Sequence, residues 1–418
     1  MTTTAGQFQP VATFKISTWA EADYLNHSGS ATTVTLFDPD DKVNVNVTLL
    51  AYHGECRVVY RQFKHLPWNN PDNVVTMETM VLLLKILGGV FIPLLSFIGV
   101  AANVLNCLVF FHHGLRDRIN MLLFSLACAD FLVTAYMFLY FIEYFYTVME
   151  GEFEMYGPLT TYITNSWINT LYGFVYVSAF ISTVIAVERW FCIAHPFTAK
   201  RVIKTRTTAI AVSVCGGLLV GTHYIVSDKY RIYCQYFPLS GFQMKSYYPS
   251  PFYLQHTQLV DVLNGVVYGV GLPCLFVLVT TVTTAVTAVK LKSTAAWRRD
   301  QRSGSQMESK EVALTRMLIA VSCLFIACTL PNILVRVAPF FLPEFRLGGR
   351  HQNLLVVGAL WVHFSPTVNS SLNFFFYFKM GTRFRKTLAS LCCRCVKVDV
   401  GASGMAALSS TSVVTTHV

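Results

Sequence analysis

Seven long apolar runs dominate this sequence, and only one of them, through Asp130, contains a charged side chain. Each run is long enough to cross the roughly 30 Å hydrocarbon core of a bilayer as a helix. Because lipid offers the backbone no hydrogen-bond partners, each run must satisfy its own peptide groups. The sequence therefore predicts an all-α membrane protein, a seven-transmembrane helix bundle over residues 81–379. The predicted spans are Ile86–Phe111, Ile119–Ile142, Tyr162–Val187, Thr207–Ser227, Val262–Val289, Met317–Val335 and Asn353–Phe378.

The basic residues predict how the bundle is oriented. Most of the 32 Lys and Arg residues fall in the connections after the first, third and fifth spans and in the C-terminal tail. Basic connections stay on the inner side of a membrane, so the N-terminus is expected outside the cell and the protein in the plasma membrane. The net charge of +10 is then a consequence of topology, and no nucleic-acid partner is expected.

Residues 1–80 are expected to form an extracellular N-terminal segment without a cleavable signal peptide. Acceptor sequons at Asn26 and Asn46 predict glycosylation there. Cys56 and Cys234 are the two cysteines expected on the oxidising side, where a disulfide would join this segment to the loop after the fourth span. Two unpaired thiols are the alternative. The apolar and β-branched stretch Val43–Tyr60 is expected to form a hairpin that acts as a lid.

A receptor, a transporter or a channel could each have seven spans. The spans show no broken helices or repeated halves, which weighs against a transporter, and no filter-like Gly runs, which weighs against a pore. A carboxylate in mid-span is costly and indicates a functional site. Asp130 could bind a sodium ion or remain protonated in a helix interface. Its candidate partners are Asn103, Ser178, Asn369, Ser370 and Asn373.

The third apolar run ends in the charged pair Glu188 and Arg189, followed by Trp190. Arg189 could simply flank the span, as basic residues often do on the inner side. Alternatively, the two side chains could form a latch that opens when the protein changes state.

Several motifs together resemble the rhodopsin-like G-protein-coupled receptors, over roughly residues 80–390. "GVAANVLNCLVF" and "FSLACAD" are similar to the signatures of the first and second spans. "ERW" stands where the family has Asp/Glu-Arg-Tyr, followed by "AHPF". Pro273 and Pro331 match prolines of the fifth and sixth spans, and "NSSLNFFFY" is similar to the seventh-span motif. Short stretches resemble divergent invertebrate neuropeptide receptors and molluscan chemosensory-type receptors.

The resemblance implies how the charged pair would work. Arg189 would pair with Glu188 and with Glu311 at the inner end of the sixth span in the resting state. Activation would move that end away and free Arg189 for a heterotrimeric G-protein. Trp190, Asn373 and Tyr377 are the other residues that the resemblance assigns to coupling and activation.

The chain also departs from the family pattern. Thr164 stands at the third-span position of a disulfide cysteine, Thr329 replaces the sixth-span tryptophan, and Phe374 replaces the seventh-span proline. An aromatic ring for the activation relay could instead come from Phe325, Phe374 or Phe375. The fourth span has no tryptophan or proline, and Gly217 and Gly221 are expected to allow close helix contact.

The ligand is expected to be a neuropeptide. Leu171 stands where amine receptors have an aspartate, and the seventh span has no lysine for a retinal Schiff base. Charged and aromatic residues near the outer ends of the spans could line a peptide site, or could be interfacial anchors. These candidates are Glu143, Trp167, Tyr172, Asp261, Tyr268, Arg336, Trp361 and His363. A chemosensory receptor for a small waterborne molecule and a seven-span transporter are the alternatives.

The C-terminal region is expected to contact the inner leaflet. Residues 380–391 predict an amphipathic helix with Phe384, Leu388 and Leu391 on its apolar face. In the tail, residues 392–418, three cysteines are candidates for palmitoylation or, less suitably spaced, for zinc: Cys392, Cys393 and Cys395. An arrestin-type regulator and a PDZ domain are further expected partners. No enzymatic activity is expected, because no nucleophile–base pair or phosphate loop is present.

Overall fold

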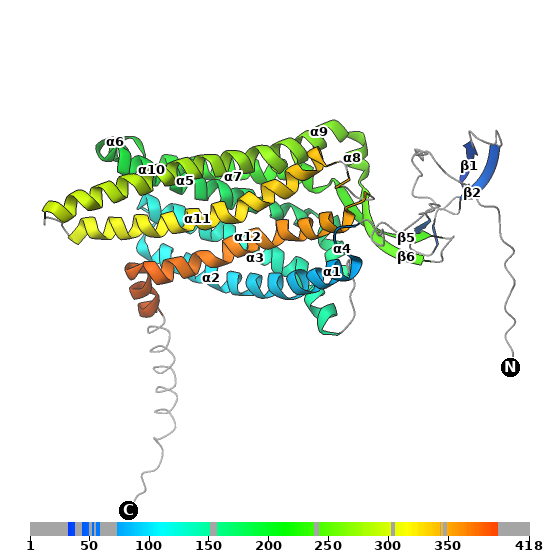
Figure 1. Cartoon of the computed structure of the whole chain (residues 1–418), viewed down its shortest axis with the longest axis horizontal. Helices are drawn as coiled ribbons and strands as arrows, with labels where there is room; N and C mark the ends of the chain where they lie inside the picture. Colours follow the sequence, from blue (N-terminus) through cyan, green and yellow to red (C-terminus); the bar gives the residue numbers. More distant parts are fainter. Residues whose placement is uncertain are drawn as a thin grey trace, which may run out of the picture.

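The computed structural model describes residues 32–37, 44–49, 52–53, 56–58, 73–150, 157–237, 242–301, 306–342, 344–345 and 349–391. Long helices run side by side along the molecule, with strands β5 and β6 at one end and helix α6 at the other (Figure 1). The helical elements are α1 (Met77–Leu83), η2 (Leu84–Phe91), α2 (Ile92–His113), α3 (Arg118–Met149), α4 (Pro158–Asn165), η3 (Trp167–Gly173), α5 (Phe174–Ala194), α6 (Pro196–Val202), α7 (Thr205–Ser227), α8 (Pro251–Gln255), α9 (Thr257–Asp261), η4 (Val262–Gly271), α10 (Leu272–Gln301), α11 (Gln306–Phe341) and α12 (Gln352–Met380).

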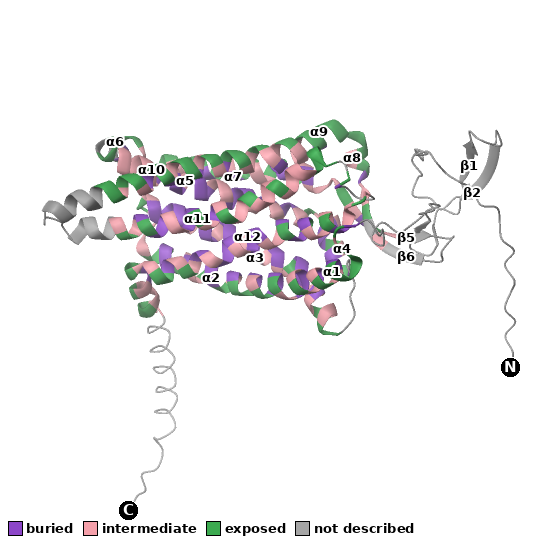
Figure 2. Cartoon of the chain, viewed as in Figure 1, coloured by how far each residue is buried: buried purple, intermediate pink, exposed green. Residues whose placement is uncertain are grey.

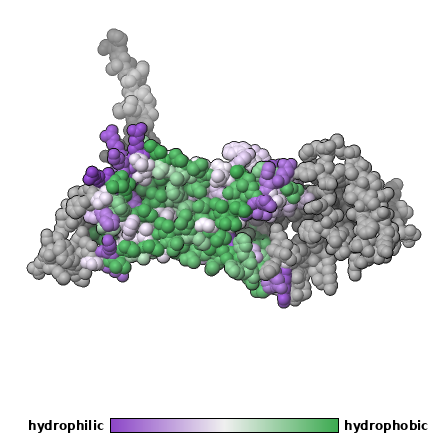
Figure 3. All heavy atoms as spheres, turned by 90° about the horizontal axis from the view of Figure 1, so that it is seen from above, coloured by the Kyte–Doolittle hydropathy of each residue, from purple (hydrophilic) through white to green (hydrophobic). Residues whose placement is uncertain are grey.

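The helices form the predicted seven-span bundle. Among the described residues, six helical stretches are long and apolar enough to cross a membrane: Met77–His113, Arg118–Met149, Trp167–Ala194, Thr205–Ser227, Thr257–Ser293 and Val312–Phe341. The seventh helix, α12, has 29 residues and packs against α2, α3 and α11. Apolar side chains form a broad band around the middle of the bundle (Figure 3), as expected for a surface that faces lipid.

Two apolar clusters hold the bundle together, and the buried residues follow the inward faces of the helices (Figure 2). One cluster includes Leu122, Ile181, Met317 and Tyr377, and the other includes Ile92, Met137, Tyr144 and Leu360. Lipid tails are as apolar as these side chains, so close packing and buried polar contacts supply the specificity of helix association.

The start of the third span differs from the prediction. Tyr162 belongs to the separate helix α4, and Ser166 adopts an extended conformation that ends it. The span then begins as the 3-10 helix η3, whose first turn is capped because the Ser166 hydroxyl accepts the Ile168 N–H at 3.3 Å. The apolar run therefore continues across a bend in the chain that hydropathy alone does not reveal.

The fourth span also differs from the prediction. A Cβ added at Gly217 or Gly221 would meet no described atom within 4 Å, so these glycines make no close helix contact. Gly216 is the glycine of α7 that faces a neighbour, because its Cβ would lie 3.5 Å from Val177 of α5.

A four-stranded sheet of order β3-β4-β5-β6 lies at the end of the bundle that the predicted orientation places outside the cell. This end is called the outer end below, and the opposite end the inner end. β5 and β6 form an antiparallel hairpin, β4 runs parallel to β5, and β1 pairs separately with β2. The short β3–β4 hairpin falls within the stretch Val43–Tyr60, for which a hairpin is predicted. The strands are β1 (Thr32–Phe37), β2 (Asn44–Leu49), β3 (Tyr52–His53), β4 (Cys56–Val58), β5 (Tyr230–Phe237) and β6 (Phe242–Pro249).

The amphipathic helix predicted after the seventh span is confirmed over residues 382–391. Its Phe384 is buried, with ring centroids 5.7 Å from Phe110 and 6.0 Å from Tyr377. Leu388 and Leu391 pack against the same cluster, so the helix docks through the predicted apolar face.

Candidate functional site

Asp130 of α3 is completely buried and accepts hydrogen bonds from three side chains. Its Oδ1 accepts from the Ser178 hydroxyl of α5 at 2.6 Å and from the Ser370 hydroxyl of α12 at 2.8 Å. Its Oδ2 accepts from the Asn373 amide of α12 at 2.8 Å. Three predicted partners thus meet at the carboxylate and join three spans, which offsets the cost of burying it.

The other two predicted partners lie around this cluster. Asn103 of α2 donates to the Ser370 carbonyl at 3.0 Å and accepts from Asn106 at 3.1 Å, so it supports the cluster from outside. The Oδ1 atoms of Asn369 and Asn373 are buried and have no hydrogen-bond partner among the described residues. A carboxylate with hydroxyls and free amide oxygens provides a set of oxygen ligands that suits a small hard cation such as sodium.

The charged pair at the inner end of α5 is part of a three-residue ion cluster. Buried Glu188 accepts from Arg189 through Oε2 and from Arg118 of α3 through Oε1 at 2.9 Å. The Cys192 thiol also donates to Oε1 at 3.4 Å, and Arg118 donates to the Ile203 carbonyl at 2.6 Å. Removing one partner of such a buried cluster leaves a charge without compensation, which is strongly destabilising.

Arg118 is the member of this cluster that sequence reasoning missed. It is 70 residues away from Glu188 along the chain, and only its place at the inner start of α3 gave a signal. Glu311, the other predicted partner of Arg189, has its side chain outside the described residues. Trp190 packs by its ring against Phe191 and His195, at 6.1 and 6.4 Å between centroids.

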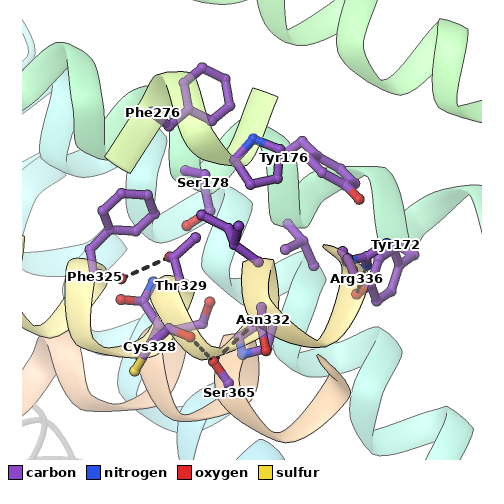
Figure 4. Close-up of a pocket in the computed structure, with 17 residues that line it drawn as sticks. Tyr172, Tyr176, Ser178, Phe276, Phe325, Cys328, Thr329, Asn332, Arg336 and Ser365 are labelled. Atoms are coloured by element: carbon purple, nitrogen blue, oxygen red, sulfur yellow. Dashed lines mark hydrogen bonds between the residues drawn. The ribbon is translucent and has the colours of Figure 1, made fainter. Parts of the chain in front are cut away.

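A pocket opens between the third span, formed by η3 and α5, and helices α10, α11 and α12 (Figure 4). Its lining residues are Tyr172, Val175, Tyr176, Ser178, Ala179, Pro273, Phe276, Phe325, Cys328, Thr329, Asn332, Ile333, Arg336, Ser365, Pro366, Asn369 and Ser370. Arg336 is the only Lys, Arg, Asp or Glu among them. Ser178 and Ser370 form the floor of the pocket and also donate hydrogen bonds to Asp130, so the pocket and the carboxylate cluster share these two residues.

Tyr172 joins three helices at the wall of this pocket. Its hydroxyl accepts from Arg336 of α11 and donates to the Val362 carbonyl of α12, both at 3.4 Å. Val362 stands four residues before Pro366, which lacks the N–H that would normally bind this carbonyl. Pro366 therefore leaves an acceptor free for Tyr172, and both hydrogen bonds are long and correspondingly weak.

The eight predicted ligand residues fall into separate groups. Tyr172 and Arg336 line the pocket, and His363 packs beside Tyr172 with ring centroids 5.5 Å apart and the two rings tilted by 57°. Trp167 and Trp361 are exposed by 67% and 36% and face away from the helix bundle, as the interfacial alternative predicts.

The remaining three predicted ligand residues serve local structure. Glu143 caps α4 by accepting the N–H groups of its first turn, at 3.0 and 2.9 Å. Asp261 binds the Lys229 ammonium at 2.6 Å, outside the pocket. Tyr268 is buried and donates to the Leu219 carbonyl at 2.6 Å. Their positions along the spans were consistent with a ligand role, but their side chains point elsewhere.

The three phenylalanines that were candidates for the activation relay lie in different surroundings. Phe325 is buried and lines the pocket beside Thr329, one turn away along α11. Its ring can contact a ligand there (Figure 4). Phe374 packs on Phe384 with 5.8 Å between centroids, and Phe375 is exposed. Tyr377 is buried against Phe110, and its hydroxyl has no partner among the described residues.

A side-chain amide joins α4, the short helix before the third span, to the outer sheet, next to the position of the missing family cysteine. Asn165 donates to the Ile232 carbonyl at 2.9 Å and accepts the Ile232 N–H at 2.8 Å. β4 reaches only Gln235 and Tyr236 of β5, so Asn165 serves the part of the strand that β4 does not cover. Sequence reasoning missed this contact, because nothing in the sequence pairs residues 165 and 232.

The bundle, the buried carboxylate and the Glu188–Arg189 pair define a helical membrane receptor, and comparison with known proteins identifies the family. The model of the seven-transmembrane receptors of the rhodopsin family matches residues 101–377, and the chain belongs to this family.

Individual relatives are more distant. Neuromedin-U receptor 2 of Homo sapiens is 24% identical over 286 residues, which cover 67% of this chain and 66% of its own length. The FMRFamide receptor of Drosophila melanogaster is 20% identical over 71% of this chain and 52% of its own length. The probable G-protein coupled receptor frpr-1 of Caenorhabditis elegans is 26% identical over 72% and 77%. The chain thus spans about two thirds of the human relative and about half of the Drosophila relative.

Proposed function

We propose that this protein is a plasma-membrane receptor, with its N-terminus outside the cell, that couples an extracellular peptide to a heterotrimeric G-protein. The observation that carries the proposal is the placement of two sites on one span. Tyr172 and Tyr176 line a pocket at the outer part of this span, and the Glu188–Arg189 pair lies at the inner end of the same span. About 17 residues separate Tyr172 from Arg189, which corresponds to roughly 26 Å of helix.

In the resting state, Glu188 holds Arg189 and Arg118 together at the inner face. Activation separates this cluster, and Arg189 becomes available to the G-protein, with Trp190, Asn373 and Tyr377 taking part in coupling. Glu311 is proposed as a further resting partner of Arg189. A cluster of this kind needs to contribute only about 1–3 kcal/mol to set a typical conformational coupling.

Two relatives support a peptide as the ligand, since they are named as receptors for neuromedin U and for FMRFamide, which is a peptide. The outer sheet also supports a large ligand, because strands rather than a short loop border the outer end of the bundle. We propose a Cys56–Cys234 disulfide in this sheet. The register sets Arg57 beside Gln235, so Cys56 is next to Cys234, which is disulfide-bonded.

Further proposals concern regulation of the same receptor. A sodium ion at Asp130 would stabilise the resting state through the oxygens of Ser178, Ser370 and the asparagines. We also propose glycosylation at Asn26 and at Asn46, which lies on β2, and palmitoylation at Cys392, Cys393 and Cys395. Asn26, these cysteines and the tail that would contact a PDZ domain and an arrestin-type regulator lie outside the described residues.

The test is G-protein activation in cells that express the protein, challenged with a peptide extract before and after protease digestion. Arg189→Ala is expected to abolish the response. Arg206→Ala is the matched control, because Arg206 is an exposed arginine at the inner start of α7. A response that requires Arg189 and is lost on digestion supports a peptide receptor. A protease-resistant response that requires Arg189 would favour a small-molecule chemosensory receptor, and solute flux independent of Arg189 would favour a transporter.

A further inference from the structure

The charge of the pocket is uncompensated. Arg336 is the single formal charge among the described lining residues, and no described carboxylate pairs with it. Its one hydrogen bond, to the Tyr172 hydroxyl, is 3.4 Å long. A guanidinium has five N–H donors, so most of its donor capacity is free for a ligand.

The rest of the lining is apolar and aromatic above a polar floor. Phe276 and Phe325 lie across the space from Arg336, and Tyr176 extends toward Arg336 (Figure 4). Asp130 lies beneath the floor of the pocket, and its carboxylate already accepts three hydrogen bonds. A ligand ammonium entering here would find a cation and no free carboxylate, which is an unfavourable arrangement.

We propose that the pocket binds the end of an apolar or aromatic ligand that carries a carboxylate or a carboxamide, and that Arg336 holds the oxygen of this group. The inference rests on the proposed function and specifies which end of the peptide enters first, namely a C-terminus rather than an amine. A planar guanidinium donates two parallel hydrogen bonds to a carboxylate, whereas a carboxamide offers it one acceptor oxygen. A short hydrogen bond of either kind is stronger than the long bond to Tyr172.

Capture of Arg336 also has a mechanical consequence. Tyr172 then loses its contact with α11 and keeps the one with the Val362 carbonyl of α12. α11 is the helix whose inner end must move to free Arg189. The ligand therefore breaks a link at the outer end of α11. Tyr172→Phe removes this link without ligand, together with the bond to Val362, and is expected to raise basal signalling.

Fragment binding to the purified full-length receptor tests the chemistry directly. The probes are N-acetyl-L-phenylalanine, its carboxamide and phenethylamine, which share one ring and differ in the polar group. Binding is read from the concentration dependence of the unfolding temperature. The acid or the carboxamide is expected to stabilise the protein at concentrations where phenethylamine does not. Whichever of these two probes binds more tightly shows whether the terminus of the ligand is a carboxylate or a carboxamide.

Variants show whether Arg336 is responsible. Arg336→Gln is expected to weaken acceptor binding at least about 10-fold, the loss of a charged hydrogen bond. Arg231→Gln is the matched control, because Arg231 is paired with Asp228 on the outer sheet. Tyr172→Phe should bind the acceptor probes as well as or better than the unmodified protein. Equal stabilisation by phenethylamine, no stabilisation by either acceptor, or an unchanged affinity in Arg336→Gln would each overturn the inference.

The two proposals fail separately. A protease-sensitive G-protein response that Arg336→Gln leaves unchanged would keep the receptor function and refute the role of Arg336. Acceptor binding that depends on Arg336, without any G-protein response that depends on Arg189, would keep the binding chemistry and refute the coupling.

Discussion

The contact between Asn165 and β5 gives a prediction whose size follows from the structure. Asn165 satisfies both the N–H and the C=O of Ile232, a residue that is only 1% exposed. Asn165→Leu would leave both backbone groups without a partner. Each unsatisfied buried group costs about 1–3 kcal/mol, so the lower limit for the pair is about 2 kcal/mol. Asn165→Asp keeps the acceptor for the N–H but loses the donor, and is expected to cost less.

The assay is amide hydrogen exchange of β5 in the receptor held in lipid nanodiscs. A loss of about 2 kcal/mol in local opening free energy corresponds to about 30-fold faster exchange around Ile232. Gln258→Leu is the control, since it replaces an exposed amide of α9 that makes no described hydrogen bond. Exchange in Asn165→Leu within about twofold of the unmodified protein would show that the amide does not hold the sheet to α4.

Three more perturbations have defined outcomes. Arg118→Met should raise basal G-protein signalling at matched surface expression, because it removes one of the two cations that hold Glu188; unchanged basal signalling would contradict the three-residue cluster. Asp130→Asn should abolish any sodium dependence of agonist affinity, and a sodium effect that survives would place the ion elsewhere. Burial alone would lower the pKa of Lys229, but its hydrogen bond to Asp261 and the nearby tyrosines raise it above its ordinary value. The stabilisation that the charged Lys229 gives the folded state is therefore present below the ordinary lysine pKa of about 10.4, and it is lost as pH rises through the higher pKa of the folded protein. Lys229→Met should remove the corresponding fall in unfolding temperature at alkaline pH.

Hydropathy and charge were sufficient to predict the bundle, because lipid imposes length and internal hydrogen bonding on every span. The Asp130 cluster was also predictable, since a buried carboxylate needs partners and the polar residues of mid-span are few. The start of the third span was predicted wrongly, because a bend at Ser166 changes neither the length nor the hydropathy of the run.

The ligand residues show what these signals lack. Depth along a span can be read from the sequence, but the rotation of a helix about its axis depends on packing against its neighbours. Arg336 and Trp361 both lie in the outer halves of their helices, yet Arg336 lines the pocket and Trp361 faces outward. Arg118 was missed for a related reason, since pairing across 70 residues is fixed by tertiary structure.

The proline of the seventh helix has an effect on distance. The chain has Phe374 where the family has a proline, and Pro366 lies eight residues earlier in α12. A proline weakens a helix at its own position, so bending is easiest there. From Pro366 to the end of α12 at Met380 is roughly 21 Å, compared with roughly 9 Å from position 374. The same 10° bend would displace the inner end by roughly 3.6 Å instead of roughly 1.6 Å. In this receptor a longer part of the seventh helix therefore moves when the helix bends, and the bending point at Pro366 lies in the wall of the pocket.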